Sequence, residues 1–187
     1  MQLENVVAYV SLGSNLGDRA GNLLLAVRGL LEAHLCVKRL SAIYETEPFG
    51  VESHSNYLNL VAEIQVTNVS PDQMLARMLR IEYLLGRRRA EATKSPRTVD
   101  LDLLMFGNLK RSSLLLKLPH PEMHRRKFVL VPLAEIAPTL VHPVLNQTIR
   151  ELLKKNADKS LVRRWQPATT SAEALSAPDF SQLSQLS

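Results

Sequence analysis

The clearest chemical feature of the sequence is a pair of acidic residues, Asp100 and Asp102, inside the apolar stretch 98–106. Such a stretch is typical of a buried strand, and alternate side chains of a strand share one face. We therefore expect both carboxylates on one face of a sheet, with the apolar side chains between them in the core. Neighbouring carboxylates repel unless a cation neutralises them, and Mg²⁺ is often held by one or two carboxylates together with substrate phosphates. The pattern alone also fits two solvated acids.

A basic segment leads directly into this acidic pair. Planar guanidinium groups suit phosphate oxygens, and cations beside a metal-binding acid pair are what phosphoryl transfer requires. A second basic cluster at 124–127 follows His120, which lies between two prolines and is a candidate phosphate donor. The alternative for both clusters is a solvated surface that aids solubility. The first segment contains Arg87, Arg88, Arg89, Lys94 and Arg97.

Two aromatic residues and one amide are candidates for binding a flat heterocycle. Tyr57 opens an alternating stretch, and Asn59, two residues further on, is expected on the same face. Phe128 follows the second basic cluster. The two rings could stack on a heterocycle while the amide reads its hydrogen-bonding edge, although both rings are equally compatible with core positions.

Several other chemistries lack their sequence patterns. The chain has no Walker A sequence, no kinase glycine-rich loop, no G-x-S-x-G elbow and no Cys/His zinc pattern. The GSNLG segment at 13–17 is loosely glycine-rich and is predicted only as a turn from strand to helix. The acidic pair with its basic neighbours is therefore the main candidate site.

Composition limits the class of protein. At 187 residues with 45% hydrophobic and 22% charged residues, the chain is predicted to form a globular domain, and a disordered chain or a coiled coil is excluded. The net charge of +5 indicates an anionic partner. A single cysteine, Cys36, favours a reducing compartment, so we expect a cytoplasmic protein. Neither a signal peptide nor a membrane-spanning run is predicted.

The elements that position these residues follow a β-α-β-β-α-β order. Strands are predicted at 6–12, 35–46, 57–67 and 98–106, and Asp18 and Ser70 begin the two intervening helices. This order predicts a ferredoxin-like α+β fold, in which an antiparallel four-stranded sheet carries helices packed on one face. Short helices and turns are expected from there to about residue 155.

Five stretches of the sequence together resemble one family. They are VAYVSLGSNLGDR, YETEPFG with SNYLNLV, IEYLLGRRR, SPRTVDLDLLMFG and LPHPEMHRRKFVLVPLAEIAP, in that order between residues 6 and 155. The chain is similar to the 6-hydroxymethyl-7,8-dihydropterin pyrophosphokinase (HPPK) family. The resemblance implies that the β,γ-pyrophosphoryl unit of ATP is transferred to the hydroxymethyl oxygen of the pterin in folate biosynthesis, with release of AMP.

The same resemblance implies roles for individual residues. Asp100 and Asp102 would hold two Mg²⁺ ions, with Arg87 and Arg97 completing the catalytic set. ATP would be bound by Glu82, Arg87, Arg89, Arg97, Leu103, His120 and Arg126. The pterin would be bound by Thr46, Glu47, Pro48, Phe49, Gly50, Tyr57, Asn59 and Phe128.

The chain departs from the family pattern in two places. Some members carry a tryptophan in the loop before the PRT motif, where this chain has Lys94, and its only tryptophan is Trp165. Leu79 replaces a residue that is polar in some members. Closure over the substrate is expected to differ in detail, while the acidic and arginine positions are retained.

Domain and partner predictions complete the interpretation. Residues 1–157 are predicted to form the pyrophosphokinase domain and 158–187 a disordered tail, because 167–187 contain no lysine or arginine and are rich in small polar residues. We expect a monomer that binds only small-molecule substrates, with no nucleic acid and no membrane partner. A ferredoxin-like nucleic-acid-binding module and an inactive nucleotide-binding relative are the alternatives. The first does not explain an acidic pair beside the arginines.

Overall fold

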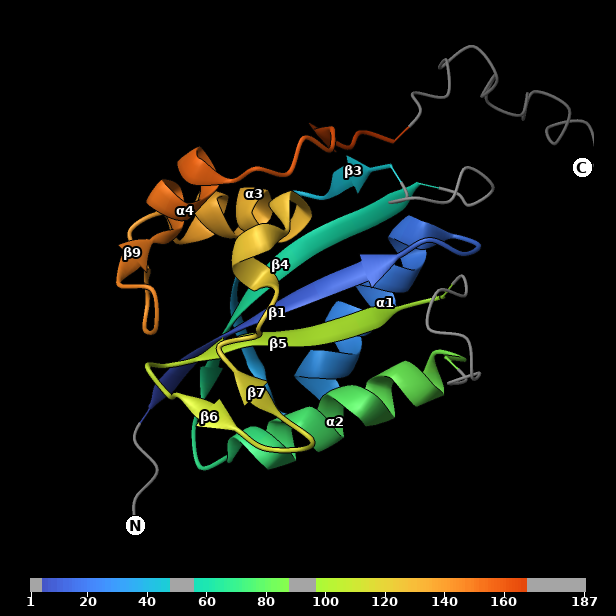
Figure 1. Ribbon diagram of the computed structural model, residues 1–187. Coiled ribbons are helices and arrows are strands. Elements are labelled where there is room, and N and C mark those ends of the chain that lie inside the picture. The colour runs from blue at the N-terminus through green and yellow to red at the C-terminus, as the bar shows by residue number, and fades with distance from the viewer. Residues whose placement is uncertain (1–4, 48–55, 88–96, 168–187) are drawn as a thin grey trace, which may run out of the picture.

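The computed structural model describes residues 5–47, 56–87 and 97–167, and Figure 1 shows the arrangement of its elements. The strands are β1 Val6–Ser14, β2 Cys36–Leu40, β3 Tyr44–Thr46, β4 Tyr57–Val66, β5 Asp100–Phe106, β6 Arg111–Ser112, β7 Lys117–Leu118, β8 Val141–His142, β9 Gln147–Thr148 and β10 Val162–Arg164. The helices are α1 Arg19–Glu32, α2 Pro71–Leu84, the 3₁₀ helix η1 Met123–Arg125, α3 Lys127–Ile136 and α4 Ile149–Lys155.

The main sheet has the predicted antiparallel, ferredoxin-like core. Its strands follow the order β10-β3-β4-β1-β5, and β2 also pairs with β4. Every pairing in this sheet is antiparallel. β1 and β4 lie in the centre, α1 connects β1 to β2, and α2 connects β4 to β5. The predicted α+β fold class is therefore confirmed.

The single strand predicted at 35–46 is divided into β2 and β3. Both strands pair with β4, and Ser41 lies between them. The Ser41 N–H donates to Val61 O at 2.9 Å, and the Ser41 hydroxyl accepts from Val61 N–H at 2.9 Å. The Ser41 hydroxyl thus replaces a backbone carbonyl as the acceptor in the sheet. This replacement explains why a continuous apolar stretch forms two strands.

The two helices of the predicted core, α1 and α2, pack on one face of the sheet as expected, and the later helices α3 and α4 cover the opposite face. Ala8, Val10 and Leu12 of β1 share a core with α1 and α2. Tyr9, which points to the opposite face, belongs to a second core with α3 and α4. Figure 1 shows α3 in front of the sheet and α1 on its far side. The active-site prediction depends on this second face, since α3 carries Phe128.

The two helices of the first face begin and approach each other as their sequences require. Ser70 caps α2 in a reciprocal capping box with Gln73. Asp18 accepts from Gly21 N–H at 3.0 Å and caps α1. Gly29 lets α1 approach α2 closely, because a Cβ there would lie 2.9 Å from the Ile81 side chain.

The structured part of the chain extends beyond the predicted domain boundary at residue 157. β10 lies inside the predicted tail and pairs with β3, and Trp165 N–H donates to Ile43 O at 2.8 Å. Residues 158–167 therefore belong to the fold, because backbone pairing compensates for their polar composition. The rest of the predicted tail, 168–187, lies outside the described residues. Among the described helices, none has the length and apolar character needed to cross a membrane.

Candidate active site

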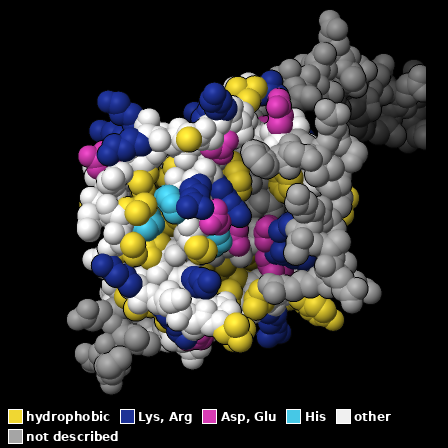
Figure 2. Space-filling view, viewed as in Figure 1, with side chains coloured by type: hydrophobic (Ala, Val, Ile, Leu, Met, Phe, Trp, Pro, Cys, Tyr) yellow, Lys and Arg dark blue, Asp and Glu magenta, His cyan; other side chains and the backbone are white. Residues whose placement is uncertain are grey.

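The acidic pair lies on one face of β5, as its spacing predicts. Leu101 and Leu103 are 5% and 4% exposed in the core, while Asp100 and Asp102 are partly exposed on the opposite face. In the neighbouring strand β1, Gly13 pairs with Asp100 and Ser11 with Asp102. Figure 2 shows acidic, basic and histidine side chains gathered on this face of the molecule.

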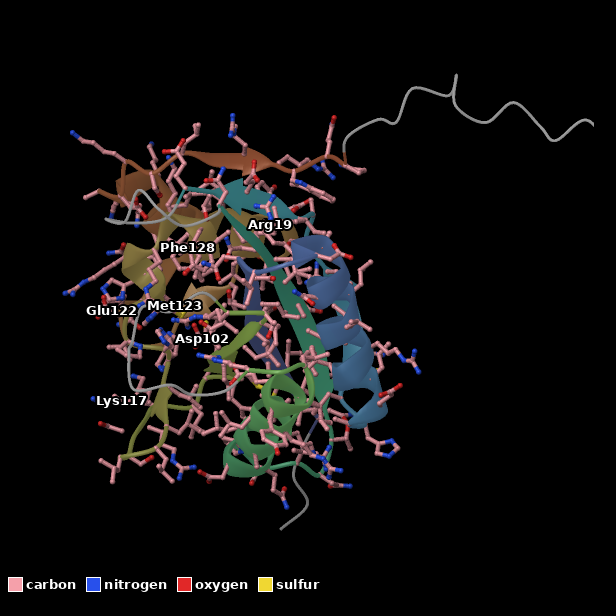
Figure 3. All side chains as sticks on the ribbon, turned by 90° about the vertical axis from the view of Figure 1, so that its right-hand side faces the viewer. Arg19, Asp102, Lys117, Glu122, Met123 and Phe128 are labelled. Atoms are coloured by element: carbon pink, nitrogen blue, oxygen red, sulfur yellow. The ribbon has the colours of Figure 1, made fainter. Side chains whose placement is uncertain are left out.

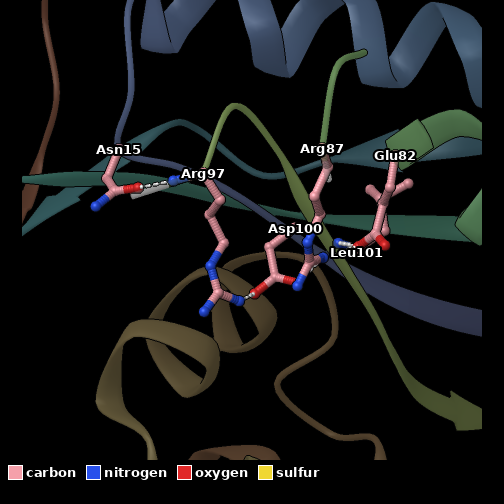
Figure 4. Close-up of polar contacts among 6 residues, drawn as sticks. All are labelled: Asn15, Glu82, Arg87, Arg97, Asp100 and Leu101. Carbon is pink, nitrogen blue, oxygen red and sulfur yellow. Dashed lines mark hydrogen bonds and ion pairs between the residues drawn. The ribbon is translucent and has the colours of Figure 1, made fainter. Parts of the chain in front are cut away.

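Two arginines hold Asp100 from the two ends of the basic segment. Arg87 Nη1 donates to Asp100 Oδ1, and Arg97 Nη1 donates to Asp100 Oδ2 (Figure 4). Arg87 Nη1 also donates to Glu82 Oε1 at the end of α2. Burial opposes the charge of Arg87, but the Asp100 and Glu82 carboxylates more than compensate, so the pKa of Arg87 is raised. The predicted juxtaposition of acids and arginines is therefore present.

Glu82 connects α2 to the first residues of β5. Its side chain is buried, and its Oε1 accepts from Leu101 N–H at 2.8 Å. β5 is an edge strand, so this backbone group points away from β1 and needs a partner. The carboxylate fixes the register of α2 against β5, and with it the position of Arg87 relative to Asp100.

Asp102 carries unfavourable negative charge. Its pKa is raised, first by burial and then by the nearby Asp100 carboxylate, while His120 and Arg126 act in the opposite direction. A carboxylate in this position gains from a nearby cation. Among the described residues, no group of three or more His, Cys, Asp or Glu side chains could hold a metal ion. Asp100 and Asp102 offer two oxygen-donor side chains on one face of β5, which fits a hard cation shared with substrate phosphates.

His120 faces Asp102 from the turn before η1. The backbone N–H of His120 donates to Leu104 O at 2.8 Å, which holds the turn against β5. Its Nδ1 accepts from Glu122 N–H at 3.2 Å, so the neutral ring carries its proton on Nε2. Burial lowers the pKa of His120, although the Asp102 carboxylate opposes this. The ring is therefore a hydrogen-bond donor through Nε2 beside the acidic pair.

A cavity of about 310 Å³ lies along the free edge of β5. Its polar wall contains Glu82, Arg87, Asp100, Asp102 and His120. Its apolar wall comes from α2, β5 and the β6–β7 connection and includes Leu75, Leu79, Leu101, Leu103 and Leu115, with Lys117 beside them. A wall of charge next to a wall of leucines suits a ligand with a phosphate end and a flat, less polar end.

A second group of predicted residues lies on the other side of β1. Asn59 is 3% exposed, and its Nδ2 donates to Thr46 Oγ1 at 3.0 Å. In the sheet, Gly13 pairs with Asn59 on one side and with Asp100 on the other. A Cβ on Gly13 would lie 3.1 Å from Asn59 Oδ1, so the glycine keeps the space between the two groups open.

The predicted aromatic residues come from separate elements. Tyr57 begins β4, and Phe128 lies in the first turn of α3, which packs on β4. Arg126 Cζ lies 5.8 Å from the centre of the Phe128 ring, which brings a predicted phosphate ligand and a predicted pterin ligand together. Figure 3 shows Phe128 and Lys117 on opposite sides of Asp102. Glu47 is exposed, and Pro48, Phe49, Gly50, Arg89 and Lys94 lie outside the described residues.

Asn15 is a site residue that the sequence interpretation missed. Its Oδ1 accepts from Arg97 N–H at 2.8 Å, and its N–H donates to Arg97 O at 3.2 Å (Figure 4). It is 2% exposed, and its buried Nδ2 has no hydrogen-bond partner among the described residues. The sequence signal for Asn15 is a polar residue at the end of an apolar strand, in a segment that is predicted only as a turn.

Comparison with known proteins identifies the family. Residues 9–138 match the model of 7,8-dihydro-6-hydroxymethylpterin-pyrophosphokinase (HPPK). The chain belongs to this family. The HPPK assignment is supported by sequence similarity to a Bacillus subtilis protein named 2-amino-4-hydroxy-6-hydroxymethyldihydropteridine pyrophosphokinase. The two sequences are 41% identical over 86% of this chain and 91% of the Bacillus protein. A Haemophilus influenzae protein of the same name is 40% identical over 84% of this chain and 98% of its own length.

Solved structures support the HPPK fold. A Plasmodium falciparum HPPK-DHPS structure matches 81% of this chain with a TM-score of 0.64 and 18% identity. This chain covers 45% of that longer chain. At this level of identity the likeness concerns the fold. The family and the enzyme class predicted from the sequence are both confirmed by the comparisons.

Proposed function

We propose that this chain transfers pyrophosphate from ATP to the hydroxymethyl group of 6-hydroxymethyl-7,8-dihydropterin, giving AMP and the pterin diphosphate in folate biosynthesis. The observation that carries the proposal is the cavity in which Asp100 and Asp102 lie beside Arg87, with apolar residues opposite. The HPPK family match supplies the pterin as acceptor.

ATP occupies the cavity along β5 in this proposal. The leucine wall with Leu103 holds the base, and Glu82 orients the end of α2. Arg87, Arg97, His120 and Arg126 face the triphosphate and draw charge from it, together with Arg89, which lies outside the described residues. His120 contributes through its Nε2–H, because its Nδ1 is engaged with Glu122.

Asp100 and Asp102 hold two Mg²⁺ ions in this proposal. The fit rests on two carboxylates that share one face of β5 and line the same cavity, where a cation would relieve the charge that burial and Asp100 make unfavourable at Asp102. When bound, ions held by Asp100 and Asp102 would supply positive charge that stabilises the negative charge developing on the phosphates.

The pterin lies on the other side of Gly13. Asn59 reads its polar edge, while Thr46 fixes the amide of Asn59 by accepting from Nδ2. Tyr57 and Phe128 stack on the ring. Glu47, Pro48, Phe49 and Gly50 complete the binding segment in this proposal.

The residues act mainly by positioning. Asn59 and Asp100 flank Gly13 on adjacent strands, so the sheet itself fixes the acceptor side against the phosphate side. Holding two reactants in line removes a large entropic barrier, and preorganised cations stabilise the charge of the transition state. No described side chain has the geometry to be assigned as general base.

The test is an AMP assay. The chain is incubated with ATP, MgCl₂ and 6-hydroxymethyl-7,8-dihydropterin, and AMP is expected only when all three are present. Asp100→Ala and Asp102→Ala should each lower turnover by about a hundredfold or more, because each removes metal-dependent charge stabilisation. Asp72→Ala is the matched control, since Asp72 lies on α2 and pairs with Arg111 of β6 at 2.6 Å. Release of ADP, or normal AMP formation by both variants, would contradict the proposal.

The proposal also covers the oligomeric state, the location and the partners of the protein. We propose a monomer that acts in the cytoplasm on small molecules and binds no nucleic acid. Light scattering with size-exclusion chromatography reports the oligomeric state. Salt-sensitive binding of a single-stranded RNA probe without AMP formation would favour the nucleic-acid-binding alternative.

A further inference from the structure

Arg19, the first residue of α1, joins two segments that are distant in sequence. Its Nη1 donates to Glu45 Oε1 at 2.9 Å and to Asn56 O at 2.7 Å. The side chains of Arg19 and Glu45 are 25% and 21% exposed, so this ion pair is better shielded from solvent than one on an open surface. A charge-assisted contact with two partners fixes both of them relative to α1.

The two segments that Arg19 joins carry three predicted pterin ligands. Glu45 directly precedes Thr46, and Asn56 directly precedes Tyr57. Thr46 pairs with Tyr57 across β3 and β4, and Asn59 follows two residues later on β4. The guanidinium therefore connects the Glu45 side chain to the Asn56 backbone, directly before the residues from which this part of the site is built.

β10 contributes to the same contact. It pairs with β3 so that Arg163 lies opposite Glu45, and Arg163 Nη2 is 3.7 Å from Glu45 Oε2. The Glu45 carboxylate is thus shared between α1 and the carboxy-terminal strand. Figure 3 shows Arg19 on a different part of the molecule from Asp102 and Lys117.

We propose that Arg19, with Glu45, is a positioning residue for the pterin half of the site. It sets the spacing between Thr46 and Tyr57 without touching the cavity along β5. The inference rests on the proposed function, because Thr46, Tyr57 and Asn59 are pterin ligands only under that proposal. Its expected signature is a change in pterin binding that leaves ATP binding unaltered.

The experiment compares Arg19→Gln, Arg19→Lys and Glu45→Gln with the parent chain in the AMP assay. Arg19→Gln and Glu45→Gln should raise KM for the pterin by about fivefold to tenfold, the change expected from losing one charge-assisted contact. KM for ATP and kcat should stay within about twofold of the parent values. Arg19→Lys should restore much of the pterin affinity, because an ammonium group can still donate to both oxygens.

Glu32→Gln is the matched control, since it removes the Arg28–Glu32 ion pair of 2.7 Å on the outer surface of α1. Thermal unfolding is measured for every variant, and pterin binding is also titrated in the presence of α,β-methylene ATP. Equal changes in both KM values, or no change in pterin binding, would overturn the inference. A parent chain that forms no AMP would instead refute the proposed function, so the two failures are distinguishable.

Discussion

At the level of single residues, the charge balance of the site depends on the carboxylate of Asp100. Arg87 and Arg97 each bind one of its oxygens, and Arg87 also neutralises Glu82. Glu82 is buried, with a side chain only 4% exposed, whereas the side chain of Asp100 is 25% exposed. The two arginines therefore support carboxylates in different environments, and their removal should have different structural costs.

We predict that Arg87→Met destabilises the fold far more than Arg97→Met. Loss of Arg87 removes a cation that pairs with both buried Glu82 and Asp100, which costs about 3 kcal/mol of unfolding free energy. Loss of Arg97 costs about 1 kcal/mol or less, because Asp100 is partly solvated and retains Arg87. Urea unfolding measures the difference, and AMP formation should fall in both variants. Equal losses of stability would show that Glu82 does not depend on Arg87.

At the scale of elements, the site depends on how the end of β1 meets the start of β5. Asn15 bonds to both backbone groups of Arg97, and Asn22 ties the same turn together by donating to Leu16 O at 2.8 Å. Asn15 lies in the β1–α1 connection and Asn22 in the first turn of α1, and of the two only Asn15 bonds to the segment that carries Arg97, a predicted catalytic residue. Asn15 thereby fixes the backbone of Arg97, from which the guanidinium extends to Asp100.

Asn15→Ala should lower kcat/KM for AMP formation by about tenfold, since Arg97 loses a hydrogen bond that fixes its backbone. Asn22→Ala is the matched control and should leave kcat/KM within about twofold of the parent value. Both variants should lose about 1 kcal/mol of stability, the usual contribution of one hydrogen bond. If the two variants lost activity equally, the turn as a whole would position Arg97 and Asn15 would have no special role.

At the scale of the whole molecule, the carboxy-terminal segment closes the fold around α3. Asp158 Oδ2 accepts from Lys127 N–H at 2.9 Å at the start of α3, next to Phe128. Further along, β10 extends the sheet and Trp165 packs against the core beneath α1 and α2. A segment with few apolar residues thus contacts both sides of the sheet.

Two deletions separate the contributions of this segment. Removing 168–187 should leave both stability and AMP formation close to those of the full chain, since the contacts of β10, Asp158 and Trp165 remain. Removing 158–187 eliminates all of them and should lower the melting temperature by several degrees, with about 2 kcal/mol lost from the missing hydrogen bonds and packing. Thermal unfolding compares the three chains. An unchanged melting temperature for the longer deletion would restore the predicted boundary at residue 157.

His142 makes the stability of the molecule sensitive to acid. It is 4% exposed, and its Nδ1 accepts from Val144 N–H at 3.3 Å and Leu145 N–H at 3.2 Å. Burial lowers its pKa, and His124, whose ring centre is 6.1 Å away, lowers it further. An unfolded histidine titrates near pH 6.5, so the unfolded chain binds more protons just below that pH. Stability from the neutral ring is therefore complete above about pH 6.5 and declines as the pH falls.

His142→Asn should weaken this acid dependence. The amide oxygen of asparagine can accept the same backbone hydrogen bonds without titrating. The variant should be less stable than the parent at pH 7, because a smaller side chain packs less well, but should lose less stability between pH 7 and pH 5. Melting temperatures across this pH range test the prediction, and parallel curves for the two proteins would contradict it.

Local patterns were sufficient for much of the fold and for the central residues of the site. Period-two alternation placed Asp100 and Asp102 on one face, and the Ser70 capping signal located the start of α2. The missed features depend on contacts across the sequence. Asn15 and Arg97 are 82 residues apart, and Arg19 and Asn56 are 37 apart. No local spacing indicates such pairs.

The sequence by itself determined the order of the core elements, the chemistry of the acidic pair and its basic neighbours, and the family. These follow from residue types, short-range periodicity and motifs that act within one element. Only the tertiary structure decided that α3 covers the opposite face, that β10 joins the sheet, and that Gly13 separates Asn59 from Asp100. Those outcomes depend on strand register and on which faces pack together, and such long-range contacts form only when the whole chain is folded.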